Sequence, residues 1–129
     1  MRQKNNPGLI FIVDDIQENR DLAKIYLEKL GWKTLCCESG RQALVELETA
    51  TPHAILLDIK MPGIDGISMA KVIRCESHHD DLKIVGYTAH ALNDEIQFIL
   101  DSGFDEILIK PVTYRDLSDC FGTNDVVFL

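Results

Sequence analysis

The chain has 129 residues, 46% hydrophobic and 26% charged, a composition typical of one globular domain with its own core. Its net charge of -8 makes direct binding to nucleic-acid phosphates unfavourable. The first residues, MRQKNNPG, are polar, and no run reaches the roughly 20 apolar residues of a membrane helix. We therefore expect a cytoplasmic protein that has no signal peptide and does not contact a membrane.

Short apolar runs alternate with longer segments of helical period along the chain. Strands are predicted at residues 9–13, 33–37, 54–57, 83–87 and 106–109. Helices are predicted before Gly31, after Ser39, at residues 65–75, at about 91–102, and from near Thr113. This alternation predicts an α/β fold, a flavodoxin-like doubly wound sheet of five parallel strands in the order 2-1-3-4-5, with five helices on its two faces.

The two ends of the chain break this pattern. Residues 1–8 are expected to form a flexible tail, and the domain itself is expected to span residues 9–121. Gly122 and Asn124 are expected to end the last helix early, which leaves residues 122–129 as a C-terminal tail.

Four of the predicted strands run directly into polar residues. Asp14 and Asp15 follow the first strand, Asp58 the third, Thr88 the fourth and Lys110 the fifth. In open α/β sheets the ligand crevice lies outside the carboxyl ends of the strands, where the strand order reverses. The sequence therefore predicts that three carboxylates, a hydroxyl and an ammonium group converge on one edge of the sheet.

This set of side chains suits phosphoryl transfer. Crowded carboxylates repel one another unless a cation neutralises them, and Mg²⁺, which Mn²⁺ can replace, prefers oxygen ligands. The four cysteines form no C-x-x-C pair and no histidines stand at metal-site spacing, which argues against zinc. Lys110 and Thr88 could bind phosphoryl oxygens, and Asp58 could act as a nucleophile that forms an aspartyl phosphate.

Structural roles remain open for the same residues. Asp14 and Asp15 could cap the first helix, Thr88 could begin the helix that follows it, and Lys110 could be a solvated lysine. Asp58 could be a satisfied polar end of its strand.

The pattern resembles the receiver domain of two-component response regulators. The resemblance is carried by IFIVDD, LLDIKMPGIDG, GYTAHA and ILIKPV, which occur in order, each at a strand end, over about residues 9–121. Receivers attached to hybrid sensor kinases and stand-alone receivers are the most similar. The family implies a signalling switch that catalyses only its own phosphorylation and dephosphorylation, and is otherwise not an enzyme.

The resemblance implies a role for each residue at the metal. Asp15 would bind magnesium directly, and Asp14 mainly through water. Asp58 and the backbone carbonyl of Lys60 would complete the protein ligands.

The resemblance also implies how the phosphoryl group is handled. Asp58 would accept it from a histidine of a partner kinase or histidine phosphotransfer protein, Thr88 would swing toward it, and Lys110 would pair with it. The Lys110–Pro111 peptide bond would be cis. The side chain of Lys60 and that of His90 would overhang the phosphoryl group and affect its lifetime.

One position departs from the family. Receivers usually carry a Tyr or Phe three residues before the lysine, whereas this chain has Ile107. This departure keeps open a pseudo-receiver that binds partners without phosphorylation. An aspartyl-phosphate phosphatase is a second alternative to a phospho-accepting receiver. No output domain fits after residue 121, so we expect either a single-domain regulator, a monomer or weak dimer acting on a downstream protein, or a piece of a longer chain.

Overall fold

The computed structural model describes residues 4–75, 81–89 and 92–124. Its elements in chain order are β1 (Lys4–Val13), α1 (Gln17–Lys29), β2 (Lys33–Cys37), α2 (Gly40–Leu47), β3 (Ala50–Asp58), α3 (Gly66–Cys75), β4 (Lys83–Thr88), α4 (Asn93–Asp101), β5 (Glu106–Ile109) and α5 (Tyr114–Phe121). Within these described ranges, no helix has the length and apolar character needed to cross a bilayer.

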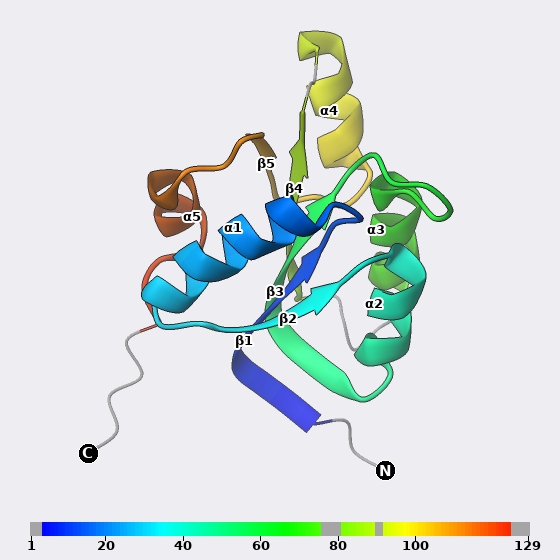
Figure 1. Ribbon diagram of the computed structural model, residues 1–129. Helices are drawn as coiled ribbons and strands as arrows, with labels where there is room; N and C mark the ends of the chain where they lie inside the picture. The colour runs from blue at the N-terminus through cyan, green and yellow to red at the C-terminus, as the bar shows by residue number, and fades with distance from the viewer. Residues whose placement is uncertain (1–3, 76–80, 90–91, 125–129) are drawn as a thin grey trace, which may run out of the picture.

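The five strands form one parallel sheet in the order β2-β1-β3-β4-β5, which confirms the predicted topology. Helices α1 and α5 cover one face of the sheet, and α2, α3 and α4 lie on the other (Figure 1). The strand order reverses between β1 and β3, so the chain leaves these neighbouring strands toward opposite faces. This reversal opens the edge of the sheet where a ligand crevice is expected.

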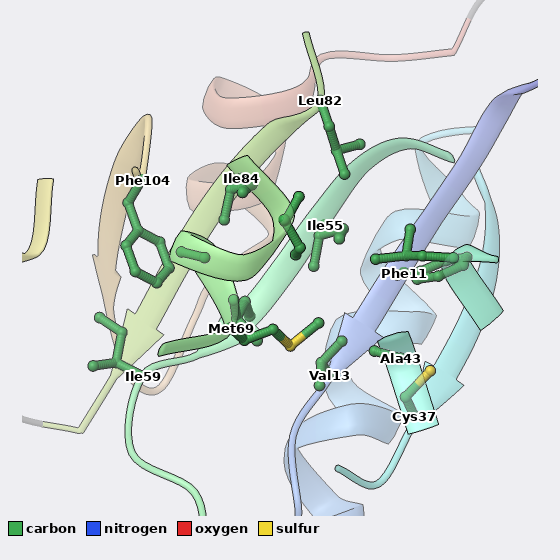
Figure 2. Packing of buried hydrophobic residues seen from close by; sticks show 14 of the residues in the cluster. Phe11, Val13, Cys37, Ala43, Ile55, Ile59, Met69, Leu82, Ile84 and Phe104 are labelled. Atoms are coloured by element: carbon green, nitrogen blue, oxygen red, sulfur yellow. The ribbon is translucent and has the colours of Figure 1, made fainter. Parts of the chain in front are cut away.

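Strand periodicity explains the two halves of the core. Phe11 and Val13 of β1 point into the cluster under α2 and α3, whereas Ile10 and Ile12 point into the cluster under α1 and α5. Figure 2 shows the first of these clusters, in which Met69 of α3 lies over the strand residues. Because both faces are covered, the central strands β1 and β3 carry continuous apolar runs, Leu9–Val13 and Ala54–Leu57, rather than alternating residues.

The first strand begins earlier than predicted. Residues 4–8, which we expected in the N-terminal tail, belong to β1, and residues 4–6 pair with residues 50–52 of β3. A register shift separates this short ladder from the main one, which starts at Ile10. The prediction missed it because backbone pairing at the end of a sheet needs no apolar side chains, and the sequence here is polar.

The last helix ends at Phe121, directly before Gly122 as predicted, and residues 122–124 contact the end of α1. The indole Nε1 of Trp32 donates a hydrogen bond of 2.8 Å to the Gly122 carbonyl. The Asn124 N–H donates one of 2.8 Å to the Leu30 carbonyl. Residues 122–124 are therefore attached to the domain, and residues 125–129 of the predicted tail lie outside the described part of the chain.

Candidate functional site

Parallel pairing of neighbouring strands brings the predicted carboxylates together. Val13 pairs with Leu57, so that Asp14 and Asp58 leave adjacent strands at the same edge. Oxygen atoms of Asp14, Asp15 and Asp58 all lie within 4.8 Å of one another. Asp14 and Asp58 are buried, whereas Asp15 is exposed. The predicted acidic cluster is therefore present, with the Asp15 carboxylate facing solvent.

Lys110 provides the positive charge of the site. Its Nζ lies 3.0 Å from Asp14 Oδ2 and 3.3 Å from Asp58 Oδ2, and only 13% of its side chain is exposed. Its backbone N–H donates a hydrogen bond of 2.8 Å to the carbonyl of Thr88. The Lys110–Pro111 bond is cis, as predicted. One ammonium group is thus shared between two buried carboxylates from different strands.

The remaining predicted residues lie around this pair. Thr88 ends β4 and is buried, and it lines a groove of about 720 Å³ between the loop after β3 and α4. The backbone N–H of Lys60 donates a hydrogen bond of 3.2 Å to Asp58 Oδ1, while its side chain is exposed. His90, the other residue expected over the phosphoryl group, lies outside the described residues.

The two buried carboxyl groups differ in their acidity. Burial is the largest influence on the pKa of Asp14 and raises it, but the Tyr87 hydroxyl, the Ile16 N–H and Lys110 together bring it below its ordinary value. The Ile16 N–H donates a hydrogen bond of 2.9 Å to Asp14 Oδ1. For Asp58, burial and then the charge of Asp14 raise the pKa to about 6, against the opposing effect of Lys110. Asp14 therefore holds the negative charge, and Asp58 is the more readily protonated of the two.

The donor set fits a hard divalent cation. All three side chains offer carboxylate oxygen, and the repulsion between Asp14 and Asp58 is of the kind that a bound cation removes. Asp14 Oδ2 is buried and, despite its closeness to Lys110, completes no hydrogen bond of regular geometry among the described residues. Asp14, Asp15 and Asp58 are thus the side chains that could hold such an ion.

We expect Asp58→Asn to stabilise the metal-free protein by about 2 kcal/mol at about pH 7.5. The folded-state pKa of Asp58, about 6, lies above the ordinary aspartate value of 3.8, so the folded protein holds this proton more tightly than the unfolded chain does. Stability from this proton is present below the unfolded-state pKa and is lost as the pH rises through the folded-state pKa. The advantage of asparagine should therefore disappear near pH 4.

Urea unfolding in the presence of a chelator, at both pH values, measures this difference. Asp65→Asn, at an exposed aspartate in the loop before α3, is the control and should change little at either pH. A gain that persists at the acidic pH would show that ionisation of Asp58 is not its cause.

Two residues at this site were not found from the sequence. Arg20 of α1 donates a hydrogen bond of 2.8 Å from Nη1 to the Asp14 carbonyl and so supports the loop after β1. The Tyr87 ring lies beneath Lys110, whose Nζ is 4.6 Å from the ring centroid. The one available signal was the aromatic residue directly before Thr88, in a strand whose other buried apolar side chains, Ile84 and Val85, are aliphatic.

The chain belongs to the response regulator receiver domain family, whose model matches residues 10–121. This confirms the resemblance seen in the strand-end motifs. The family's members act as signalling switches in two-component systems, and the acidic pocket lies at the strand ends where the motifs placed it.

Proteins of known sequence and structure are similar to this chain. The sensor histidine kinase GacS of Pseudomonas protegens is 37% identical over 112 residues, which are 84% of this chain and 12% of that protein. Our chain therefore spans about an eighth of this relative's length. CheY4 of Vibrio cholerae shares the fold, with a TM-score of 0.83 at 24% identity over 88% of this chain and 95% of that one.

A further solved structure is that of the receiver domain of the sensor histidine kinase PA1611 from Pseudomonas aeruginosa. It has a TM-score of 0.80 and 28% identity, and the match covers 88% of this chain and 93% of that one. That structure has a magnesium ion coordinated in its active-site cleft.

Proposed function

We propose that this receiver domain accepts a phosphoryl group on Asp58, with Mg²⁺, from a phosphohistidine of a sensor kinase or histidine phosphotransfer protein. The observation that carries the proposal is the placement of Asp58 between the charges of Asp14 and Lys110 at the reversal of strand order. The magnesium ion in the PA1611 receiver domain, a relative in both fold and sequence, supports the choice of metal. We place the reaction in the cytoplasm.

The transfer exchanges one covalent bond for another. An Asp58 oxygen attacks phosphorus, the P–N bond of the phosphohistidine breaks, and the imidazole keeps the bonding electron pair and takes up a proton. Lys110 neutralises charge on the phosphoryl oxygens, and Thr88 donates a hydrogen bond to one of them. Asp14, Asp15, Asp58 and the Lys60 carbonyl would hold magnesium, which supplies further neutralisation of the phosphoryl charge.

We propose that phosphorylation changes a protein-binding face built from α4, β5 and α5. Phe98 of α4 is 58% exposed and Ile109 of β5 is 49% exposed, so these elements already present apolar side chains. Ile107, which replaces the usual aromatic residue, is partly buried in the core beside Gly86. With no ring to turn inward at residue 107, the change would pass through α4 and β5 moving together.

Incubation of the purified chain with acetyl phosphate tests the proposal. We expect intact-mass spectrometry to show one added phosphoryl group per chain when Mg²⁺ is present and none when it is chelated. Asp58→Asn should abolish the added mass, while the control Asp65→Asn should keep it, because Asp65 is an exposed aspartate whose Oδ1 accepts a hydrogen bond from the Ser68 N–H.

Failure of the wild-type chain to gain this mass would favour a pseudo-receiver. Turnover of simple phosphoesters by the wild-type chain would instead favour a phosphatase. The residue two positions after Asp58 is Lys60, whereas such phosphatases commonly carry an aspartate there as the general acid.

A further inference from the structure

Asp15 is the exposed member of the acidic cluster, and no group among the described residues donates a hydrogen bond to its carboxylate. The Asp14 carboxylate, in contrast, accepts a hydrogen bond of 2.9 Å from the Ile16 N–H and lies 3.0 Å from Lys110 Nζ. Because no donor holds the Asp15 carboxylate, its direction depends on the backbone on either side of it. A group that fixes this backbone therefore also fixes the direction of the exposed oxygen ligand.

Arg20 of α1 holds the chain on both sides of Asp15. Its Nη1 donates a hydrogen bond of 2.8 Å to the Asp14 carbonyl, which belongs to the peptide group that joins Asp14 to Asp15. Its backbone N–H donates one of 3.2 Å to the carbonyl of Ile16, the residue after Asp15. One residue of the helix is thus bonded to the peptide group before Asp15 and to the carbonyl that follows it.

The other interactions of the Arg20 guanidinium group do not explain its position. Only 12% of the side chain is exposed, yet its ion pair is long: Nη2 lies 3.7 Å from Glu38 Oε1, and 78% of the Glu38 side chain is exposed. An ion pair with such an exposed partner contributes little to stability. A cation near the N-terminal end of a helix also interacts unfavourably with the helix dipole. The hydrogen bond to the Asp14 carbonyl is therefore the contact that accounts for the placement of Arg20.

The charge of Arg20 and its hydrogen bond have opposite effects on a cation at this site. A guanidinium group beside the acidic cluster repels a divalent cation and so lowers its affinity. The hydrogen bond to the Asp14 carbonyl restricts the peptide group before Asp15, so less conformational entropy is lost when the Asp15 carboxylate binds the ion. Removal of the side chain therefore strengthens cation binding if the charge dominates, and weakens it if the hydrogen bond dominates.

We propose that Arg20 is a positioning residue that holds the Asp14–Asp15 peptide group so that the exposed Asp15 carboxylate is directed to the divalent cation. The inference rests on the metal site of the proposed function. In this role Arg20 acts through the backbone and does not touch the cation itself. Groups that orient metal ligands in this way strengthen metal binding because the ligands are held in place before the ion arrives.

Arg20→Met removes the donors and the charge and leaves an unbranched apolar side chain. We expect Mg²⁺ to bind this variant about tenfold more weakly than the wild type, at the lower end of the effect of removing a group that orients metal ligands. Arg20→Lys should recover part of the affinity, because its ammonium group can donate a hydrogen bond to the same carbonyl. Isothermal titration calorimetry with magnesium chloride, without any phosphoryl donor, measures the dissociation constants.

Lys24→Met is the matched control, because Lys24 is exposed one turn further along α1 and the substitution removes the same charge. Its affinity for Mg²⁺ should equal that of the wild type or be slightly higher. A thermal melt without metal sets a temperature at which every variant is folded. An Arg20→Met variant that binds Mg²⁺ as tightly as the wild type, or more tightly, would overturn the inference. An equal loss in Lys24→Met, or no recovery in Arg20→Lys, would overturn it as well.

The two proposals fail in different ways. A wild-type chain that binds no Mg²⁺ would overturn the metal site of the proposed function and this inference with it. A wild-type chain that binds Mg²⁺ but gains no phosphoryl group from acetyl phosphate would overturn the proposed phosphorylation alone. Equal Mg²⁺ binding by the wild type and Arg20→Met, in a chain that is phosphorylated on Asp58, would overturn the inference alone.

Discussion

Replacing Lys110 by alanine is expected to lower the free energy of unfolding by about 3 kcal/mol when divalent cations are absent. Lys110 Nζ lies 3.0 Å from Asp14 Oδ2 and 3.3 Å from Asp58 Oδ2, so one substitution removes the cation from two buried carboxylates. Removing one partner of a buried ion pair is strongly destabilising because the remaining charge stays in the interior without compensation.

Two conditions should reduce this loss. Added Mg²⁺ should restore part of the stability if the ion binds between the carboxylates, because it replaces the missing positive charge. Acid should also reduce it, because protonation of Asp58, whose pKa Lys110 lowers, removes one of the two buried charges that the substitution leaves without a cation. The loss should therefore be larger at neutral pH than at about pH 4.

Urea unfolding of Lys110→Ala at both pH values, with chelator or with Mg²⁺, measures these effects. Lys33→Ala is the matched control, since Lys33 is exposed on β2 and its removal leaves the buried carboxylates paired. A loss that is the same at both pH values and unaffected by Mg²⁺ would mean that packing of the lysine stem, rather than its charge, stabilises this edge of the sheet.

Gly66→Ala is the second substitution with a large expected effect, a loss of about 3 kcal/mol in the free energy of unfolding. A Cβ at residue 66 would collide with the carbonyl oxygen of Asp58 and would stand 2.7 Å from the Cα of Ile59. Both are backbone atoms, of the last residue of β3 and of the residue after it, so no side-chain rotation can relieve the collision. The Gly66 N–H also donates a hydrogen bond of 2.9 Å to the Ile59 carbonyl, which ties the two segments together.

The collision should also impair the site, because relief requires the segment that carries Asp58 to shift. We expect slower phosphoryl uptake from acetyl phosphate in Gly66→Ala under conditions where the variant remains folded. Gly63→Ala is the control: its φ of 79° makes alanine unfavourable by about 1 kcal/mol, but no atom lies within 4 Å of the new Cβ. Equal losses in the two variants would show that close approach at residue 66 is not the cause.

The sequence by itself determined the fold class, the strand order and which residues meet at the carboxyl ends of the strands. Apolar runs that end in Asp14, Asp58, Thr88 and Lys110 are local patterns, and parallel strands with alternating helices leave few topologies open. Because parallel strands end at a common edge, the convergence of these residues followed from their order along the chain. The cis Lys110–Pro111 bond followed from the family resemblance in the same region.

Only the tertiary structure decided how these groups interact. The sequence does not show that the Lys110 ammonium group lies between the carboxylates of Asp14 and Asp58. It also does not show that the pKa of Asp14 is lowered and that of Asp58 raised. Nor does it show that residue 66 must be a glycine because its Cα approaches the backbone of Asp58 and Ile59 closely.

The physical reason is the range over which each property acts. Apolar periodicity and the ends of strands depend on residues that are close together in the sequence. The side-chain pattern repeats along each element, every two residues in a strand and about every 3.6 in a helix. Ion-pair distances, desolvation and the space around a Cβ depend on atoms from different strands, and they change steeply over about an ångström. Tyr87 is the clearest example. Its ring and hydroxyl belong to the site only because Lys110 and Asp14, which follow other strands, lie beside them.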